Sequence, residues 1–210
     1  MEQTKNLLAL DEIEHGFYNA TDSQTVRHPT LMTQVHSADV LVLENDTDVQ
    51  PEVDAFVTAR PYINLTIKTA DCAPVLLADA KNKVVGAVHA GWKGAFQGVI
   101  ENTILKMLEQ GAELKHIHAA IGPCLHLESF EVSDDFKALF PRTEYCFFEQ
   151  KDGKEYFDFL AYVIHRIRRA GVKSIEAIDI DTYTSSDYFS YRRDPKNPGR
   201  QYSCIKLSNK

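Results

Sequence analysis

The sequence of 210 residues lacks several features that define whole classes of protein. No run approaches the roughly 20 apolar residues of a transmembrane helix, so no membrane partner is expected. The opening residues, MEQTKNLLALDEIEHG, show no basic segment leading into an apolar one, which favours a cytoplasmic protein over a secreted one. Lysine and arginine number 23 against 30 aspartates and glutamates, a net charge of −7, so nucleic acid is not an expected partner either.

Cysteine is also scarce, and the four present lie far apart at Cys72, Cys124, Cys146 and Cys204. In a chain of cytosolic character they are expected to be reduced rather than paired in disulfides. Cys146 and Cys204 stand among alternating apolar residues, which favours a place in the core. Cys72 and Cys124 follow strand ends beside polar residues, which makes them candidates for chemistry.

What is present is the composition of an ordinary globular protein, with 44% apolar and 25% charged residues. No linker rich in Pro, Gly or Ser divides the chain, so residues 1–210 are expected to form a single domain. Small molecules are the expected partners, and we expect a monomer or a weak homodimer.

Strand-like runs outnumber helical ones. Val, Ile, Leu and Thr content and punctuation by Pro and Asn predict strands at 39–45, 54–59, 63–68, 74–79, 83–90, 116–122, 174–181 and 201–207. Helical spacing of apolar residues predicts helices at 95–110, 133–140 and 159–170, and Asp152-Gly153 predicts a hairpin turn. Because strands and helices interleave without regular alternation, the sequence favours an α+β fold in which helices cover mixed sheets.

Polar side chains collect at the ends of the predicted strands. His36 stands just before a strand, Asp71 and Cys72 lie at a corner between two strands, and His89 ends a strand that leads into a glycine turn. Two imidazoles and one thiolate suit Zn²⁺, whose catalytic sites often use three protein ligands and leave a fourth position open. The spacing alone leaves a structural, hydrogen-bonded role open for each histidine.

Two turns are further candidates. Gly91 and Gly94 bracket Lys93 in a turn that allows a close backbone approach to a ligand and precedes a helix able to receive an anion. Gly122-Pro123 breaks a buried strand and leaves Cys124 at its mouth, where we expect it to line the same cavity as Cys72. The alternative for Cys124 is a structural turn with a half-buried thiol.

Residues 185–201 combine arginines with aromatic side chains, a pattern that can hold phosphate and stack a base. If the segment is extended, Ser190 and Arg192 face one side, whereas Tyr191 and Arg193 face the other. Ser190 and Arg192 are then the expected anion ligands. The competing interpretation is that Arg192 and Arg193 both make structural salt bridges.

These segments together resemble the YfiH family, also called the laccase-domain, polyphenol-oxidase or DUF152 family. The resemblance runs from about residue 33 to residue 205 through TQVHSADV, DAFVT, TADCAPVLLAD, VGAVHAGWKGAFQGVI, AAIGPC with FEV, and YFSYRRD with GRQ. It implies a four-layer α/β/β/α sandwich with mixed sheets, of the cytotoxic necrotizing factor and YfiH type. It also implies metal ligands at His36, Cys72 and His89, with zinc favoured over copper.

The resemblance further implies a purine nucleoside phosphorylase that cleaves adenosine, inosine or methylthioadenosine with phosphate and has an adenosine deaminase side activity. The expected catalytic residues are Asp71, as general base or ligand-orienting group, with Cys72 and Cys124. The expected substrate-binding residues are Lys93, Ser190 and Arg192. The chain departs from the family after His15-Gly16-Phe17, where YNATDSQTVRHP replaces a loop rich in glycine and serine.

Three alternatives stay open. A cysteine hydrolase acting on peptidoglycan precursors would use Cys72 as nucleophile and His89 as base. A copper-dependent polyphenol oxidase would need a weak axial ligand, for which Met32 is the nearby methionine, and many more than the eight histidines present. The third alternative is a metal-binding partner protein without catalysis. Metal content separates the first alternative from the metalloenzyme, because a thiolate bound to zinc is a poor nucleophile.

Overall fold

The chain folds around a mixed sheet of six strands, which we call the large sheet. The structure is a computed structural model and describes residues 1–196 and 199–208. The strands of the large sheet follow in the spatial order β11 (Ser174–Ala177), β7 (His118–Ile121), β5 (Ala73–Asp79), β6 (Val84–Ala90), β3 (Ala55–Thr58) and β2 (Val40–Val42). The outer pairs β11–β7 and β2–β3 are parallel, whereas the pairs between them are antiparallel.

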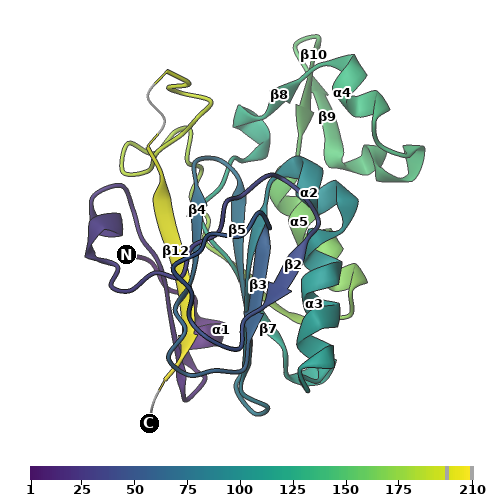
Figure 1. Cartoon of the computed structure of the whole chain (residues 1–210). Helices are drawn as coiled ribbons and strands as arrows, with labels where there is room; N and C mark the ends of the chain where they lie inside the picture. Colours follow the sequence, from purple (N-terminus) through teal and green to yellow (C-terminus); the bar gives the residue numbers. More distant parts are fainter. Residues whose placement is uncertain (197–198, 209–210) are drawn as a thin grey trace.

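Two antiparallel sheets of three strands complete the β-structure (Figure 1). The small sheet has the order β1 (Ile13–Phe17), β12 (Gln201–Leu207) and β4 (Leu65–Thr69). The aromatic sheet has the order β8 (Glu131–Val132), β10 (Lys154–Phe157) and β9 (Phe148–Lys151). The small sheet thus joins strands from both ends of the sequence.

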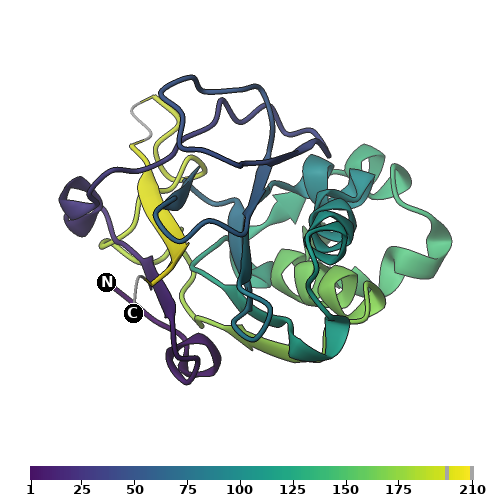
Figure 2. The ribbon, with the colours of Figure 1, turned by 60° about the horizontal axis from the view of Figure 1, so that its bottom comes forward.

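The helices lie mainly on one side of the large sheet (Figures 1 and 2). The α-helices are α1 (Lys5–Leu8), α2 (Trp92–Gln97), α3 (Val99–Glu109), α4 (Asp134–Ala138) and α5 (Phe159–Arg169). The short 3-10 helices are η1 (Asp22–Thr25), η2 (Leu114–His116), η3 (Leu127–Ser129) and η4 (Arg142–Phe147). Helix α3 packs on β6 and β3, and α1 packs on β1, β7 and β11. Among the described residues no helix has the length and apolar character needed to cross a membrane.

The alternation of side chains along β5 explains how the layers stack. Val75 and Leu77 belong to the core shared with the helices, whereas Leu76 and Ala78 belong to the core shared with the small sheet. All seven residues of β5 are buried, because the large sheet is covered on both faces. The order of helices, large sheet and small sheet, with α1 and η1 beside the small sheet, confirms the predicted α+β fold with mixed sheets.

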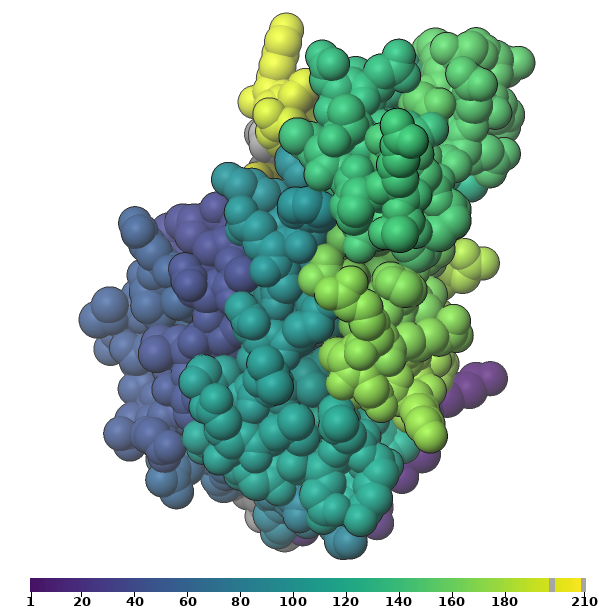
Figure 3. Space-filling view, turned by 90° about the vertical axis from the view of Figure 1, so that its right-hand side faces the viewer, coloured from purple at the N-terminus to yellow at the C-terminus, as the bar shows by residue number. Residues whose placement is uncertain are grey.

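The aromatic sheet packs through rings. Phe136, Phe140, Phe148 and Phe157 form a chain of ring contacts with centroids 4.8–6.2 Å apart, and Trp92 of α2 joins it at 4.8 Å from Phe136. Such contacts add to the burial of apolar area. In Figure 3 this part of the chain, in green, projects at the top of the molecule.

The predicted elements are found with two shifts. The expected helix 95–110 is two helices, because Gly98 takes a left-handed φ of 101° between α2 and α3. Arg166 of α5 supports this break by donating to the carbonyl of Phe96 and to Glu101. The expected strand 174–181 ends at Ala177. The hairpin at Asp152-Gly153 is confirmed, since both residues have positive φ between β9 and β10.

The buried histidine of β1 generates a prediction on stability. His15 is 6% exposed, and its Nε2 accepts the backbone N–H of Thr4 at 3.0 Å. Burial lowers the pKa of His15 to about 4, against a smaller opposing effect of Glu176. Because the pKa in the folded state lies below that of the unfolded state, stability is complete above about pH 6.5 and falls as the pH drops toward 4.

The free energy of unfolding of the wild type should fall between pH 7.5 and pH 4.5. We expect this fall to be smaller by about 2–3 kcal/mol in His15→Gln, because glutamine does not take up a proton. Urea unfolding at the two pH values measures this difference. His28→Asn in an exposed loop is the control, and it should keep the wild-type slope. A slope unchanged in His15→Gln would contradict the neutral, buried state of His15.

Candidate metal centre

Three side chains converge at one end of the large sheet. Cys72 stands just before β5, and His89 lies near the end of β6, where it pairs with Pro74 of β5. His36 comes from the loop before β2 and takes a φ of 60°, which is rare for a residue with a side chain. Antiparallel pairing of β5 and β6 therefore brings Cys72 and His89 together, and the loop adds His36 from above.

The donor atoms of the three residues lie within 4.8 Å of one another. The Sγ of Cys72 is 3.8 Å from the Nε2 of His36, and the rings of His36 and His89 meet edge to face with centroids 4.9 Å apart. His89 is buried, Cys72 is half-buried and His36 is exposed, so the group opens toward solvent on one side. Among residues 1–196 and 199–208 no other group of three such side chains comes as close.

One buried carboxylate organises two of the three. Asp54, fully buried before β3, accepts hydrogen bonds from the backbone N–H groups of Val35, His36 and Ser37 and from the hydroxyl of Ser37. It also pairs with the Nδ1 of His89 at 2.7 Å. Burial alone would raise the pKa of Asp54, but these bonds outweigh it and lower the pKa to about 2. Asp54 is therefore an anion at neutral pH.

Cys72 and His89 are electrostatically coupled. Burial would raise the pKa of the Cys72 thiol, but the charge of His89 and the hydrogen bond with His36 lower it to about 6. Burial would lower the pKa of His89, but Cys72 and Asp54 raise it to about 9. Without a metal, thiolate and imidazolium thus stabilise each other, and the thiolate form needed for metal binding is already favoured.

The glycine turn makes room for the loop that carries His36 rather than for a bound small molecule. A Cβ on Gly91 would lie 2.6 Å from the Cδ2 of His36, and one on Gly94 would lie 2.8 Å from the carbonyl of Ser37. The predicted close approach is therefore made by the His36 loop. Lys93 is exposed on the first turn of α2 and is not among the residues that line the cavity described next, so its role in substrate binding stays a prediction. Its position in the turn points it to solvent.

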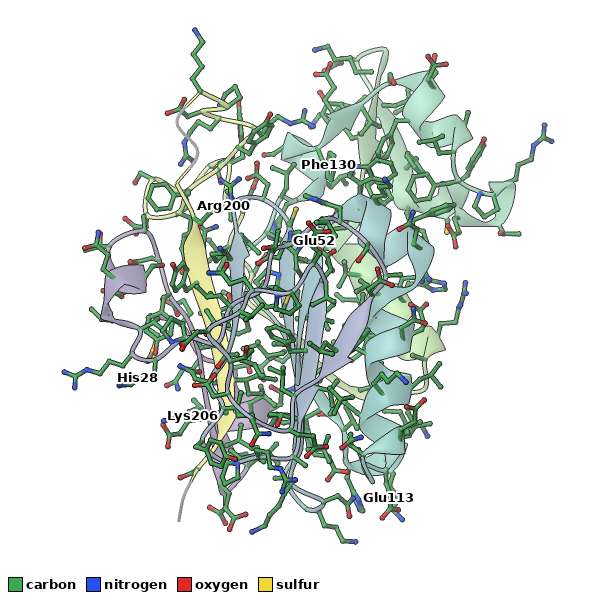
Figure 4. The ribbon with its side chains drawn as sticks, viewed as in Figure 1. His28, Glu52, Glu113, Phe130, Arg200 and Lys206 are labelled. Atoms are coloured by element: carbon green, nitrogen blue, oxygen red, sulfur yellow. The ribbon has the colours of Figure 1, made fainter. Side chains whose placement is uncertain are left out.

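A cavity of about 370 Å³ lies over the three side chains. Besides His36, Cys72 and His89 it is lined by Gln34, Lys68, Thr69, Ala70, Asp71, Leu125, Phe130, Tyr191, Arg192 and Arg200. In Figure 4, Phe130 and Arg200 lie at the same upper end of the molecule, and they come from the segment before β8 and from the segment before β12. Cations and aromatic rings thus share one wall of the cavity.

Asp71 holds this wall in place. One of its carboxylate oxygens accepts the hydroxyl of Thr182 and the other accepts the backbone N–H of Arg192, each at 2.7 Å. Asp71 itself has a φ of 87°. Because both oxygens are engaged, the geometry favours the positioning role of Asp71 over a role as general base.

The two adjacent arginines have different surroundings. Arg192 lines the cavity, donates to the carbonyl of Glu131 at 3.0 Å and lies 5.4 Å from the ring centroid of Phe130. Arg193 turns away, and its guanidinium donates to the carbonyl oxygens of Thr182, Tyr183, Ser185 and Tyr188. Arg193 therefore organises the loop, whereas Arg192 is available to the site.

The expected partnership of Ser190 with Arg192 is not found. The segment is a turn rather than a strand, since the N–H of Asp194 donates to the carbonyl of Ser190. The hydroxyl of Ser190 is buried and accepts the N–H of Arg193 at 3.1 Å. The prediction that Ser190 faces the anion site is therefore wrong, because it assumed extended backbone.

The other cysteines need two corrections. Cys124 is fully buried in the helix-side core and does not line the cavity, and burial raises the pKa of its thiol well above the ordinary value. It bridges to Asp181 through the backbone, so its place is the structural turn. Cys146 is exposed rather than in the core, because residues 142–147 form η4 instead of an alternating strand. Cys204 is buried, and no cysteine among the four is paired.

Two residues of the site escaped sequence reasoning. Asp54 opens the predicted strand 54–59, and a charged residue before a run of buried apolar ones is the signal that points to it. Phe130 opens the FEV motif of the family resemblance, which assigns it no role, although it lines the cavity. Both depend on contacts with segments distant in the sequence.

The residues present fit zinc. Donor atoms bound to one Zn²⁺ at 2.0–2.3 Å lie about 3.3–3.8 Å apart, close to the 3.8 Å that separates Cys72 and His36 here. With its Nδ1 engaged by Asp54, His89 presents its Nε2. A blue-copper site fits less well, because Met32 is buried in the core on the small-sheet side and does not line the cavity.

Comparison with known proteins shows the family to which the chain belongs. A family model described as multi-copper polyphenol oxidoreductase laccase matches residues 13–208. A purine nucleoside phosphorylase of Rickettsia conorii is 36% identical over 169 residues, which cover 78% of this chain and 70% of the relative. The purine nucleoside phosphorylase YfiH of Shigella flexneri is 35% identical over 181 residues, which cover 85% of this chain and 74% of the relative.

Solved structures give the same result. A DUF152 protein of Neisseria meningitidis superposes with a TM-score of 0.80 at 32% identity, covering 90% of this chain and 78% of the other. The hypothetical protein YfiH of Bacillus licheniformis superposes with a TM-score of 0.79 at 26% identity, covering 86% and 74%. The fold and the sequence match therefore define an α+β protein of the YfiH type. The chain belongs to the laccase-like family, which is also called DUF152.

The close packing of Gly91 on His36 generates a prediction. Gly91 has φ −74° and ψ 160°, a conformation open to alanine, so Gly91→Ala acts through the contacts of its methyl group, chiefly with the Cδ2 of His36 at 2.6 Å and less with the Sγ of Cys72 at 3.3 Å. We expect displacement of His36 and at least a tenfold loss of zinc affinity, of the order found when the support of a metal ligand is removed. Titration of Zn²⁺ against a competing chelator measures it. Lys93→Ala on the same turn should bind zinc like the wild type, and unchanged affinity in Gly91→Ala would exclude His36 as a ligand.

Proposed function

We propose that this chain is a zinc-dependent purine nucleoside phosphorylase that cleaves adenosine, inosine or methylthioadenosine with phosphate and deaminates adenosine as a side reaction. The observation that supports it most is the single cavity in which three zinc-type ligands face a wall of arginine and aromatic side chains. The substrate class is supported by relatives that are named purine nucleoside phosphorylase and that this chain matches over most of their length.

In this proposal His36, Cys72 and His89 would hold zinc beside the cavity that they help to line. Bound zinc lowers the pKa of a coordinated water toward 7, which is the chemistry that a deaminase needs. The chain itself supplies a thiolate, a histidine with Nδ1 already engaged and a half-open cavity of about 370 Å³, within the size range of small-molecule sites.

Arg192 is the proposed phosphate ligand. A guanidinium has five N–H donors, so its bond to the carbonyl of Glu131 leaves donors for an anion. Phe130 and Tyr191 line the same cavity and offer ring faces to a purine. A nucleoside held between these groups and the zinc ligands has its anomeric carbon near the bound phosphate. In the reaction an oxygen of hydrogen phosphate bonds to that carbon, the bond to the purine nitrogen breaks, and the purine leaves with the proton that the phosphate gives up.

A cysteine hydrolase acting on peptidoglycan precursors is the second candidate, and one observation favours it. Cys72, His89 and Asp54 lie in the order of a nucleophile, a base and an orienting carboxylate, and the pKa of Cys72 is lowered to about 6. In the zinc enzyme Cys72 and His89 would instead be metal ligands, and Asp54 would support His89. Metal content therefore decides between the two candidates.

The test combines metal analysis with a product assay. Protein purified without added metal is analysed for zinc and copper, and then incubated with inosine or adenosine and phosphate. We expect one zinc per chain, phosphate-dependent release of the free base and ribose 1-phosphate, and loss of both zinc and product in Cys72→Ser. Metal-free protein that cleaves an amide substrate and releases no base would instead establish the hydrolase.

The adjacent arginines provide a matched pair of variants. Because Arg192 faces the cavity, Arg192→Ala should raise the Michaelis constant for phosphate at least tenfold and leave the melting temperature nearly unchanged. Arg193 satisfies backbone carbonyls, so Arg193→Ala should lower stability by about 1–2 kcal/mol and change that constant little. Steady-state kinetics and thermal unfolding separate the effects. Equal, small kinetic effects of both variants would leave Arg192 only a structural role.

A further inference from the structure

We propose that Asp54 is the positioning residue of the site: it fixes which nitrogen His89 presents to the metal and holds the His36 loop in its binding conformation. The inference rests on the proposed zinc site, and it assigns the task to a residue that is not itself a ligand. Asp54 has no route to the cavity, because it is fully buried behind the ligands and does not line the cavity.

The two carboxylate oxygens of Asp54 bind different groups. Oδ1 accepts the N–H of His36 at 3.0 Å and pairs with the Nδ1 of His89 at 2.7 Å. Oδ2 accepts the N–H of Val35 at 3.2 Å, the N–H of Ser37 at 2.6 Å and the hydroxyl of Ser37 at 3.0 Å. One carboxylate thus joins the end of β6 to the loop that carries His36.

The bond to His89 selects the ligating nitrogen. A carboxylate accepts only, so the Nδ1 of His89 must carry a proton, and when the imidazolium gives up its second proton the lone pair for a metal forms on Nε2. The backbone of His89 strengthens the link, because its N–H donates to the carbonyl of Asp54 at 2.8 Å. The orientation of the ring is therefore set before any metal arrives.

The bonds to the loop stabilise an unfavourable backbone. His36 has a φ of 60°, a backbone conformation that is unfavourable for a residue other than glycine. Three consecutive N–H groups converge on one anion, an arrangement that needs an acceptor without hydrogens. The strained loop and the charge of Asp54 therefore stabilise each other.

An amide cannot replace this carboxylate in either orientation. If the NH₂ group of Asp54→Asn takes the place of Oδ2, it faces the N–H groups of Val35 and Ser37, and the loop is released. If it takes the place of Oδ1, it donates to the Nδ1 of His89, which moves the proton to Nε2 and blocks metal binding. Both orientations disrupt one of the two ligands.

Asp79 offers a matched control at the opposite end of β5. It is also fully buried, and its carboxylate accepts the N–H and side-chain amide of Asn82 and the N–H of Glu113. Asp79→Asn therefore removes a buried carboxylate that organises backbone, far along the strand from the ligands. Any change in zinc affinity in Asp79→Asn therefore measures the general effect of replacing a buried carboxylate in this protein.

The experiment uses Zn²⁺ alone as the probe, titrated against a competing chelator into the metal-free protein. We expect Asp54→Asn to weaken zinc binding 10–100-fold or more, Ser37→Ala to weaken it a few-fold, and Asp79→Asn to leave it unchanged. Equal affinity in Asp54→Asn and the wild type, or equal losses in Asp54→Asn and Asp79→Asn, overturns the proposal. These measurements require no turnover, so failure of the phosphorylase assay leaves them valid.

Two spectroscopic readouts complete the test. Long-range ¹H–¹⁵N spectra of the zinc-loaded wild type should show His89 protonated at Nδ1, and metal bound at Nδ1 would overturn the proposal. In the metal-free protein, amide hydrogen exchange at Val35, His36 and Ser37 should be slow in the wild type and in Asp79→Asn and at least tenfold faster in Asp54→Asn. This second readout holds even if the wild type binds no zinc, a result that would remove the proposed function itself. Unchanged exchange in Asp54→Asn overturns the proposal.

Discussion

The charge of Asp54 is the constraint from which the site follows. A carboxylate fully removed from water is costly unless hydrogen bonds and an opposite charge replace its hydration. Here the five bonds from Val35, His36, Ser37 and His89 do so. To supply them, the loop before β2 must bend over the end of β6, and this bend carries His36 to within reach of Cys72. The hydrogen bonds that stabilise the buried charge of Asp54 thus also set the positions of His36 and His89.

The opposite wall of the cavity is built by the same means with different partners. Asp71 accepts the backbone N–H of Arg192, and Arg193 donates to the carbonyls of the preceding turn. Each of these charged groups binds backbone, so each fixes a segment rather than a single side chain. Because Asp71 adjoins Cys72, the loop that carries Arg192 and the metal ligand are held by neighbouring residues of one corner. The two halves of the proposed reaction, anion binding and metal binding, are therefore set in a common frame.

Local signals predicted much of this fold. The buried runs of β5 and β6, the turn at Asp152-Gly153 and the whole of β12 follow from residues that determine their own conformation. The convergence of His36, Cys72 and His89 was indicated by their places at strand ends and by the family resemblance. Some failures are local: Gly98 breaks a helix that periodicity joins by taking a left-handed φ, and Ser190 lies in a turn closed by the next residues, Arg193 and Asp194. Others depend on distant contacts, which place Cys124 in the core. Asp54 was missed for the same reason, since its partners lie some 18 and 35 residues away.

The aromatic sheet has a consequence for how a change of sequence would affect this cavity. Residues 127–158 lie between β7 and α5, outside the large sheet, and they join the rest through ring contacts and a few hydrogen bonds rather than through shared strand pairing. Phe130 comes from this segment, whereas His36, Cys72 and His89 come from the large sheet and the loops beside it. One side of the cavity and the three candidate ligands thus come from separate stretches of the sequence. A change confined to residues 127–158 would reshape that side of the cavity and leave His36, Cys72 and His89 in place.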